Sequence, residues 1–154
     1  MMRIEVGQKA PDFSLPDQKG DTVSLSDYRG KKVLLSWHPF AFTGVCTDQM
    51  RALETHKDEF DKLNAVALGM STDPSPSKGA WAKALSIKNT KLLADFYPHG
   101  KVAKAYGQFV EEMGSSGRAN VLLDEEGIVR WIKVYDIPQL PDVQEVLKAI
   151  RDIS

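Results

Sequence analysis

The strongest constraint on the fold of this chain is an alternation of apolar runs with amphipathic stretches. The run Val33–Trp37 precedes a stretch from about Gly44 to Leu63, in which the apolar side chains fall near one helical face. A second run, Ala65–Met70, leads through a Pro-Ser break into a stretch with helical character from about Ser77 to Leu85. This order predicts a strand, a helix, a strand and a helix in succession.

The flanking segments add a small N-terminal hairpin and a second half that is rich in strands. Short alternating stretches between residues 6 and 25 predict the hairpin, which we expect to cover one sheet edge. Further expected elements are strands at 92–94, 121–123 and 129–133, and helices at 102–106 and 142–153. The prediction is an α/β chain with a thioredoxin-like fold, in which helices flank a central mixed β-sheet that carries an N-terminal β-hairpin extension.

Composition narrows the class of protein. The length of 154 residues and the lack of a repeat or linker predict a single domain, 1–154. Twenty basic residues against twenty-one acidic ones exclude a global field that would attract nucleic acid or anionic lipid. The apolar runs are far shorter than the roughly 20 residues that span a bilayer, and the first residues lack a signal-peptide layout. We therefore expect no membrane partner and a cytoplasmic location.

Cys46 is the only cysteine, which excludes an internal disulfide and a Cys-x-x-Cys redox pair. It falls in the first turn of the predicted helix, where free N–H groups and the helix dipole favour a thiolate. The preceding segment supplies a hydroxyl at Thr43 and, at Gly44, a residue that permits close approach of the backbone. The alternative is a core cysteine, because positions 46, 50, 53 and 60 share one helical face.

The string Pro39-x-x-x-Thr43-x-x-Cys46 resembles the active-site signature of the peroxiredoxin family (AhpC/TSA superfamily). The resemblance covers nearly the whole chain, from Gly7 to Trp131. The segments 95–100, 105–107 and 117–119 are similar to those of the one-cysteine alkyl hydroperoxide reductase E type. The resemblance implies a peroxidase of the same thioredoxin-like fold.

The resemblance also implies roles for individual residues. Cys46 matches the peroxidatic cysteine, which becomes a sulfenic acid. Thr43 matches the hydroxyl that contacts thiolate and peroxide, and Pro39 matches the proline that shields the pocket. Arg118 matches the arginine that stabilises the thiolate and the developing charge. The backbone N–H groups of Val45 and Cys46 would complete the peroxide cradle.

Some positions depart from the family pattern or stay open. Gln49 stands where many members carry glutamate, which puts the strength of the arginine network in doubt. Asn120 replaces an aromatic residue that often begins the following strand. Trp81 resembles a tryptophan that lies near the pocket in relatives, but a large aromatic residue in an amphipathic helix usually belongs to the hydrophobic core. The sequence leaves open whether His38 forms a hydrogen bond or only packs. Trp37, close to the site in sequence, is expected to report on it by fluorescence.

Neither a metal nor another cofactor is expected, since the histidines share no ligand spacing with one another or with Cys46. The expected partners are a hydroperoxide substrate and an external thiol or a thioredoxin/glutaredoxin-like reductant, and the expected assembly is a homodimer. Two alternatives use the same cysteine: a redox sensor or binding module without turnover, and a thiol-disulfide oxidoreductase. The last is disfavoured because that chemistry normally needs a second thiol.

Overall fold

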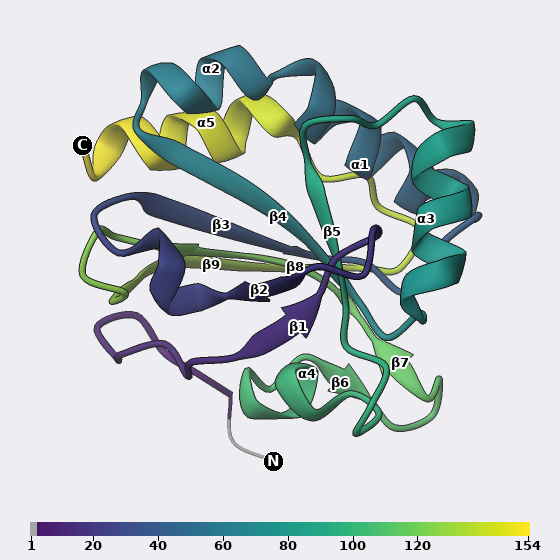
Figure 1. Cartoon of the computed structure of the whole chain (residues 1–154). Coiled ribbons are helices and arrows are strands. Elements are labelled where there is room, and N and C mark those ends of the chain that lie inside the picture. The colour runs from purple at the N-terminus through teal and green to yellow at the C-terminus, as the bar shows by residue number, and fades with distance from the viewer. Residues whose placement is uncertain (1–2) are drawn as a thin grey trace.

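The computed structural model describes residues 3–154 and contains a central five-stranded sheet (Figure 1). The strands run in the order β5 (Lys91–Ala94), β4 (Ala65–Ser71), β3 (Lys32–Trp37), β8 (Arg118–Leu123) and β9 (Val129–Tyr135). The central strand β3 pairs parallel to β4 and antiparallel to β8. The expected mixed sheet is therefore confirmed.

Four helices cover one face of this sheet: α1 (Gly44–Thr55), α2 (Lys57–Lys62), α3 (Ser75–Ala84) and α5 (Val143–Asp152) (Figure 1). The sheet face beneath them is apolar because alternate residues of each strand point to the same side. The buried cluster on this face includes Leu34, Cys46, Met50, Leu53, Phe60, Trp81, Leu92, Leu122, Leu147 and Ile150.

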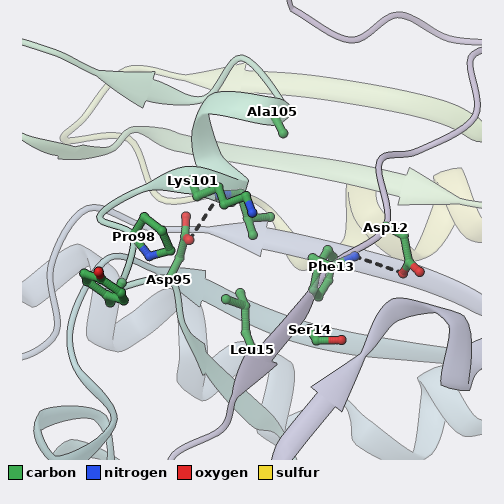
Figure 2. A pocket seen from close by; sticks show the side chains of 10 residues that line it. Asp12, Phe13, Ser14, Leu15, Asp95, Pro98, Lys101 and Ala105 are labelled. Carbon is green, nitrogen blue, oxygen red and sulfur yellow. Dashed lines mark hydrogen bonds between the residues drawn. The ribbon is translucent and has the colours of Figure 1, made fainter.

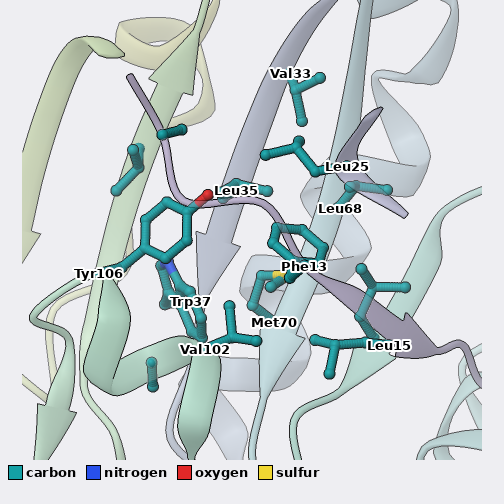
Figure 3. Packing of buried hydrophobic residues seen from close by; sticks show 14 of the residues in the cluster. Phe13, Leu15, Leu25, Val33, Leu35, Trp37, Leu68, Met70, Val102 and Tyr106 are labelled. Carbon is teal, nitrogen blue, oxygen red and sulfur yellow. The ribbon is translucent and has the colours of Figure 1, made fainter. Parts of the chain in front are cut away.

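The N-terminal hairpin packs over the opposite face. It consists of β1 (Ser14–Pro16) and β2 (Thr22–Ser24), followed by the 3₁₀ helix η1 (Leu25–Tyr28). Together with α4 (Lys101–Ala105) it buries a second apolar cluster against the sheet (Figure 3). The hairpin contacts the edge strand β5, as expected, and it also extends over the sheet face, because Leu15, Val23 and their neighbours pack on strands inside the sheet.

The structure differs from the sequence prediction at several places. The single helix expected from Gly44 to Leu63 is two helices that meet at His56, whose ring nitrogen Nδ1 lies 2.8 Å from the Ala52 carbonyl oxygen. Strand β8 begins at Arg118, three residues earlier than expected. The short pair β6 (Phe109–Val110) and β7 (Ser115–Ser116) was not predicted, because two-residue strands leave no periodic pattern.

None of the helices within residues 3–154 has the length and apolar character needed to cross a membrane.

Candidate active site

Cys46 lies in the first turn of α1, just beyond the end of the central strand β3, and its exposed fraction is only 1%. The first hydrogen bond of the helix runs from the Thr47 N–H to the Thr43 carbonyl, at 2.9 Å. The N–H groups of Val45 and Cys46 precede that bond, so helix geometry leaves them without an intrahelical acceptor. They are placed to donate hydrogen bonds to an anion or a peroxide oxygen.

Arg118 approaches Cys46 from a position 72 residues further along the chain. Its Nη1 lies 3.4 Å from the Cys46 sulfur and donates to the Gln49 Oε1 at 2.7 Å. Its Nε donates to the Ile137 carbonyl at 2.9 Å. These contacts fix a buried, permanently charged guanidinium against the sulfur, where a positive charge favours the thiolate.

Gln49 joins the arginine to the central strand. Its Oε1 accepts from Arg118, while its Nε2 donates to the Ser36 hydroxyl at 2.8 Å and to the Trp37 carbonyl at 3.0 Å. A carboxylate could take over the first of these contacts but could not donate to the Trp37 carbonyl. The neutral amide therefore holds the arginine through bonds that need both its donor and its acceptor.

Thr43 stands immediately before α1, and its hydroxyl donates to the Phe40 carbonyl at 2.8 Å. The tight turn depends on Phe42, which has the left-handed φ of 66°. A Cβ at Gly44 would meet no described atom within 4 Å, so no neighbouring part of the chain requires glycine there, and the close approach of a peroxide to this backbone stays a prediction. Gly44 lies at the open lip of the pocket described next.

The predicted site residues meet in one pocket of about 290 Å³. Pro39, Thr43, Val45, Cys46 and Arg118 line it, and Gln49 lies behind the arginine. The remaining wall comprises Phe40 and Gly44 from the signature segment together with Met113, Ile137 and Pro138, which were not predicted. These last three residues come from distant loops and carry no sequence signal of their own.

A second cavity, of about 170 Å³, lies between the hairpin and α4 (Figure 2). Its most buried polar group, the Asp95 carboxylate, accepts from the N–H groups of Val102 and Ala103 at 3.1 and 2.8 Å. Burial raises the pKa of Asp95, and these two hydrogen bonds oppose that rise. The carboxylate is therefore engaged in holding the start of α4, and the candidate reactive groups converge on the Cys46 pocket instead.

His38, Trp81 and Lys78 form a buried layer beside the active-site segment. The His38 and Trp81 rings lie 5.3 Å apart, and the Trp81 Nε1 donates to the Thr47 hydroxyl at 3.2 Å. Trp81 thus packs beside the helix turn that carries Cys46. Trp37 packs against Tyr106 on the opposite face of the sheet, with ring centroids 5.9 Å apart, so Trp81 is the better fluorescence reporter.

Lys78 was not predicted as a site residue. Its side chain is fully buried, and its Nζ lies 3.4 Å from the His38 Nε2. The sequence did hold a signal, since Lys78 precedes Trp81 and Ala82 by three and four positions and so shares their buried helical face. A lysine on such a face is unusual unless its charge has partners.

Asn120 lies on β8, where its Nδ2 donates to the Tyr135 hydroxyl at 3.2 Å. Its Oδ1 is buried and has no hydrogen-bond partner within the described part of the chain. Burial raises the pKa of Tyr135 to about 12, so the phenol stays neutral. The structure gives no reason for the replacement of an aromatic residue at this position.

Within residues 3–154, no group of three His, Cys, Asp or Glu side chains is arranged to hold a metal ion.

Comparison with known proteins places this geometry in a family. The AhpC/TSA family model matches residues 6–132. The chain is 41% identical over 140 residues to alkyl hydroperoxide reductase E of Mycobacterium bovis, covering 90% of this chain and 91% of the relative. It is 34% identical over 160 residues to peroxiredoxin Bcp of Bacillus subtilis, covering 99% of each. A reduced 2-Cys peroxiredoxin of Plasmodium vivax superposes with a TM-score of 0.87 at 33% identity, covering 96% of this chain and 81% of that one.

The chain belongs to the AhpC/TSA family, with the thioredoxin-like fold that its sequence predicts. Within that family it is a peroxiredoxin, a thiol-dependent peroxidase.

Proposed function

We propose that this chain reduces hydrogen peroxide and small organic hydroperoxides by a one-cysteine mechanism, with Cys46 as the nucleophile. The observation that carries this proposal is the contact between Arg118 and the Cys46 sulfur at the floor of the pocket. A buried cysteine on the same apolar face as Met50 and Leu53 would also suit a purely structural role. A guanidinium held against the sulfur by two further hydrogen bonds favours the reactive form instead.

In the reaction, the Cys46 thiolate attacks the terminal oxygen of the hydroperoxide. The S–O bond forms as the O–O bond breaks, so the sulfur loses two electrons and becomes a sulfenic acid. The leaving oxygen takes up a proton and departs as water or an alcohol. Arg118 and the N–H groups of Val45 and Cys46 would stabilise the charge that develops on the two oxygens.

Thr43 and Pro39 would shape the entrance to this reaction. The Thr43 hydroxyl, held at the Phe40 carbonyl, keeps its lone pairs available to a peroxide hydrogen. Pro39 and Phe40 form an apolar wall that limits water around the sulfur. Exclusion of water strengthens each electrostatic contact in the pocket.

Recycling requires a thiol from another molecule, since Cys46 is the only cysteine of the chain. One external thiol condenses with the sulfenic acid to give a mixed disulfide and water, and a second thiol releases reduced Cys46 and a disulfide. A thioredoxin- or glutaredoxin-like protein would supply both thiols. We propose a cytoplasmic location, where such reductants are maintained, and a homodimeric assembly.

A redox sensor that uses Cys46 without turnover is the second candidate, because burial of the sulfur could slow its contact with reductants. Peroxide consumption in the presence of dithiothreitol, thioredoxin or glutaredoxin separates the two. Sustained consumption well beyond one equivalent, lost in Cys46→Ser, supports the peroxidase. Consumption that stops at one equivalent with every reductant favours the sensor.

A further inference from the structure

A buried polar chain leads from α3 to the backbone of the active-site segment. The Lys78 Nζ donates to the Ser71 hydroxyl at 2.6 Å, and that hydroxyl donates to the Asp73 Oδ2 at 2.7 Å. The same carboxylate oxygen accepts the Ala41 N–H at 2.9 Å. Ala41 lies between Pro39 and Thr43 in the signature segment, so the chain ends on the loop that shapes the peroxide pocket.

The side chains that form this hydrogen-bonded chain differ in their access to water. Lys78 and Ser71 have no exposed surface, whereas Asp73 is only partly buried. A buried ammonium group costs free energy unless hydrogen bonds and opposite charges surround it. Holding Lys78 in the core is therefore a cost that a structural methionine or leucine would not carry.

The His38 ring, at the end of β3, lies against the Lys78 ammonium group. Its backbone is fixed, because its N–H donates to the Met70 carbonyl and its carbonyl accepts from the Ser116 hydroxyl. Burial, assisted by Lys78, lowers the pKa of His38 well below its usual range, so the ring is a neutral imidazole. A neutral ring can present Nε2 as an acceptor to Lys78, 3.4 Å away, and does not add a second positive charge.

We propose that Lys78 is a positioning residue of the peroxide site: its buried ammonium group anchors the Ser71–Asp73–Ala41 chain that holds the active-site loop and adds positive charge to the surroundings of Cys46. This inference rests on the proposed peroxidase function for its effect on rate. Its effect on the ionisation of Cys46 does not depend on that function.

The charges around Lys78 agree with this role. Burial lowers the pKa of Lys78 to about 7, while Asp73, the Cys46 thiolate and Asp95 favour its charged form, in that order. His38 also faces Lys78, with its Nε2 3.4 Å from the Lys78 Nζ. Because the Cys46 thiolate favours the ammonium form, the ammonium form favours the thiolate to the same extent.

The test compares Lys78→Met with Lys83→Met, which removes an exposed lysine of the same helix. Thiolate absorbance at 240 nm, followed against pH, gives the ionisation midpoint of Cys46. Stopped-flow oxidation by hydrogen peroxide gives its rate. In Lys78→Met we expect the midpoint to rise and the rate at pH 6 to fall about tenfold. Lys83→Met should match the wild type.

Ser71→Ala is a second variant, which cuts the chain and leaves the charge. It should slow peroxide oxidation several-fold with little change in the midpoint, and it decides the matter where Lys78→Met does not fold. The inference is overturned where folded Lys78→Met has the wild-type midpoint and rate, or where Lys78→Met is unfolded and Ser71→Ala reacts at the wild-type rate. Where wild-type Cys46 reacts no faster than free cysteine, the peroxidase proposal fails, and the midpoint alone then decides the role of Lys78.

Discussion

One nitrogen of Arg118 contacts both the Cys46 sulfur, at 3.4 Å, and the Gln49 side-chain oxygen, at 2.7 Å. The position of the charge at the sulfur is thus tied to an amide that is itself bonded to strand β3. Both the charge and its orientation should matter to the reaction.

Arg118→Lys should lose most of the peroxide reactivity although it keeps the charge. A lysine cannot reach the sulfur, Gln49 and the Ile137 carbonyl in one geometry. By analogy with the loss of a charge-stabilising donor, we expect a fall of about 100-fold in the rate of Cys46 oxidation, measured by stopped flow. Arg130→Lys, on the exposed side of β9, is the matched control. A rate within twofold of the wild type would show that orientation is unimportant.

Gln49→Leu should destabilise the protein and slow the reaction. The substitution leaves the Trp37 carbonyl and one donor of Arg118 without their partner inside the core. An unsatisfied buried group costs about 1–3 kcal/mol, which urea unfolding can measure. Gln49→Glu keeps the acceptor for Arg118 and should react within about tenfold of the wild type. Equal rates for the Leu and wild-type proteins would contradict this account of the network.

Gly69→Ala and Gly44→Ala should differ in stability, although both add one methyl group. At Gly69 the new Cβ would lie 2.5 Å from the Met50 sulfur and 2.8 Å from a Leu92 methyl carbon, so the core must shift. Overpacking of this kind costs about 1–3 kcal/mol. At Gly44 the Cβ points into open space, and thermal unfolding should show no loss. Equal stability of the two variants would refute the close packing of β4 against α1 at Gly69 and Met50.

The stability of the wild type should depend on pH through Lys78. Between about pH 7 and pH 10 the unfolded chain keeps this lysine protonated while the folded chain has released the proton. Unfolding then takes up a proton, so the contribution of Lys78 to stability rises with pH, by at most about 1.4 kcal/mol per unit. The difference in unfolding free energy between the wild type and Lys78→Met should therefore increase over this window. A difference that is constant with pH would mean that Lys78 is not ionised in this way.

The elements that the sequence predicted well are those with a long apolar signal. Strands β3 and β4 were visible because every residue of each run is buried or nearly so, and α5 because its apolar face repeats and Asp142 caps it. The break at His56 was not visible, since the side chain that bonds the Ala52 carbonyl leaves the apolar period unchanged. The coverage of a sheet face by the hairpin depends on contacts between distant segments, which periodicity does not encode.

The residues of the candidate site also differ in how far the sequence alone could predict them. Cys46 and Thr43 could be placed from local chemistry at a helix start. Arg118 was found through family resemblance alone. It contacts Cys46 in the fold although the two residues are 72 positions apart in the sequence, and nothing in its local sequence indicates that contact. The role of Lys78 needed the structure, since it depends on Ser71, Asp73 and His38, which reach it from other segments of the chain.

The most direct test of the peroxidase proposal is single-turnover oxidation of the reduced protein by hydrogen peroxide. Tryptophan fluorescence in a stopped-flow instrument would follow it, with Trp81 as the expected reporter beside the Cys46 turn. Intact mass would identify the product. We predict a fast phase, far faster than the oxidation of free cysteine, that adds one oxygen atom and is absent in Cys46→Ser. Oxidation no faster than that of free cysteine would contradict the proposal that Cys46 is a peroxidatic nucleophile.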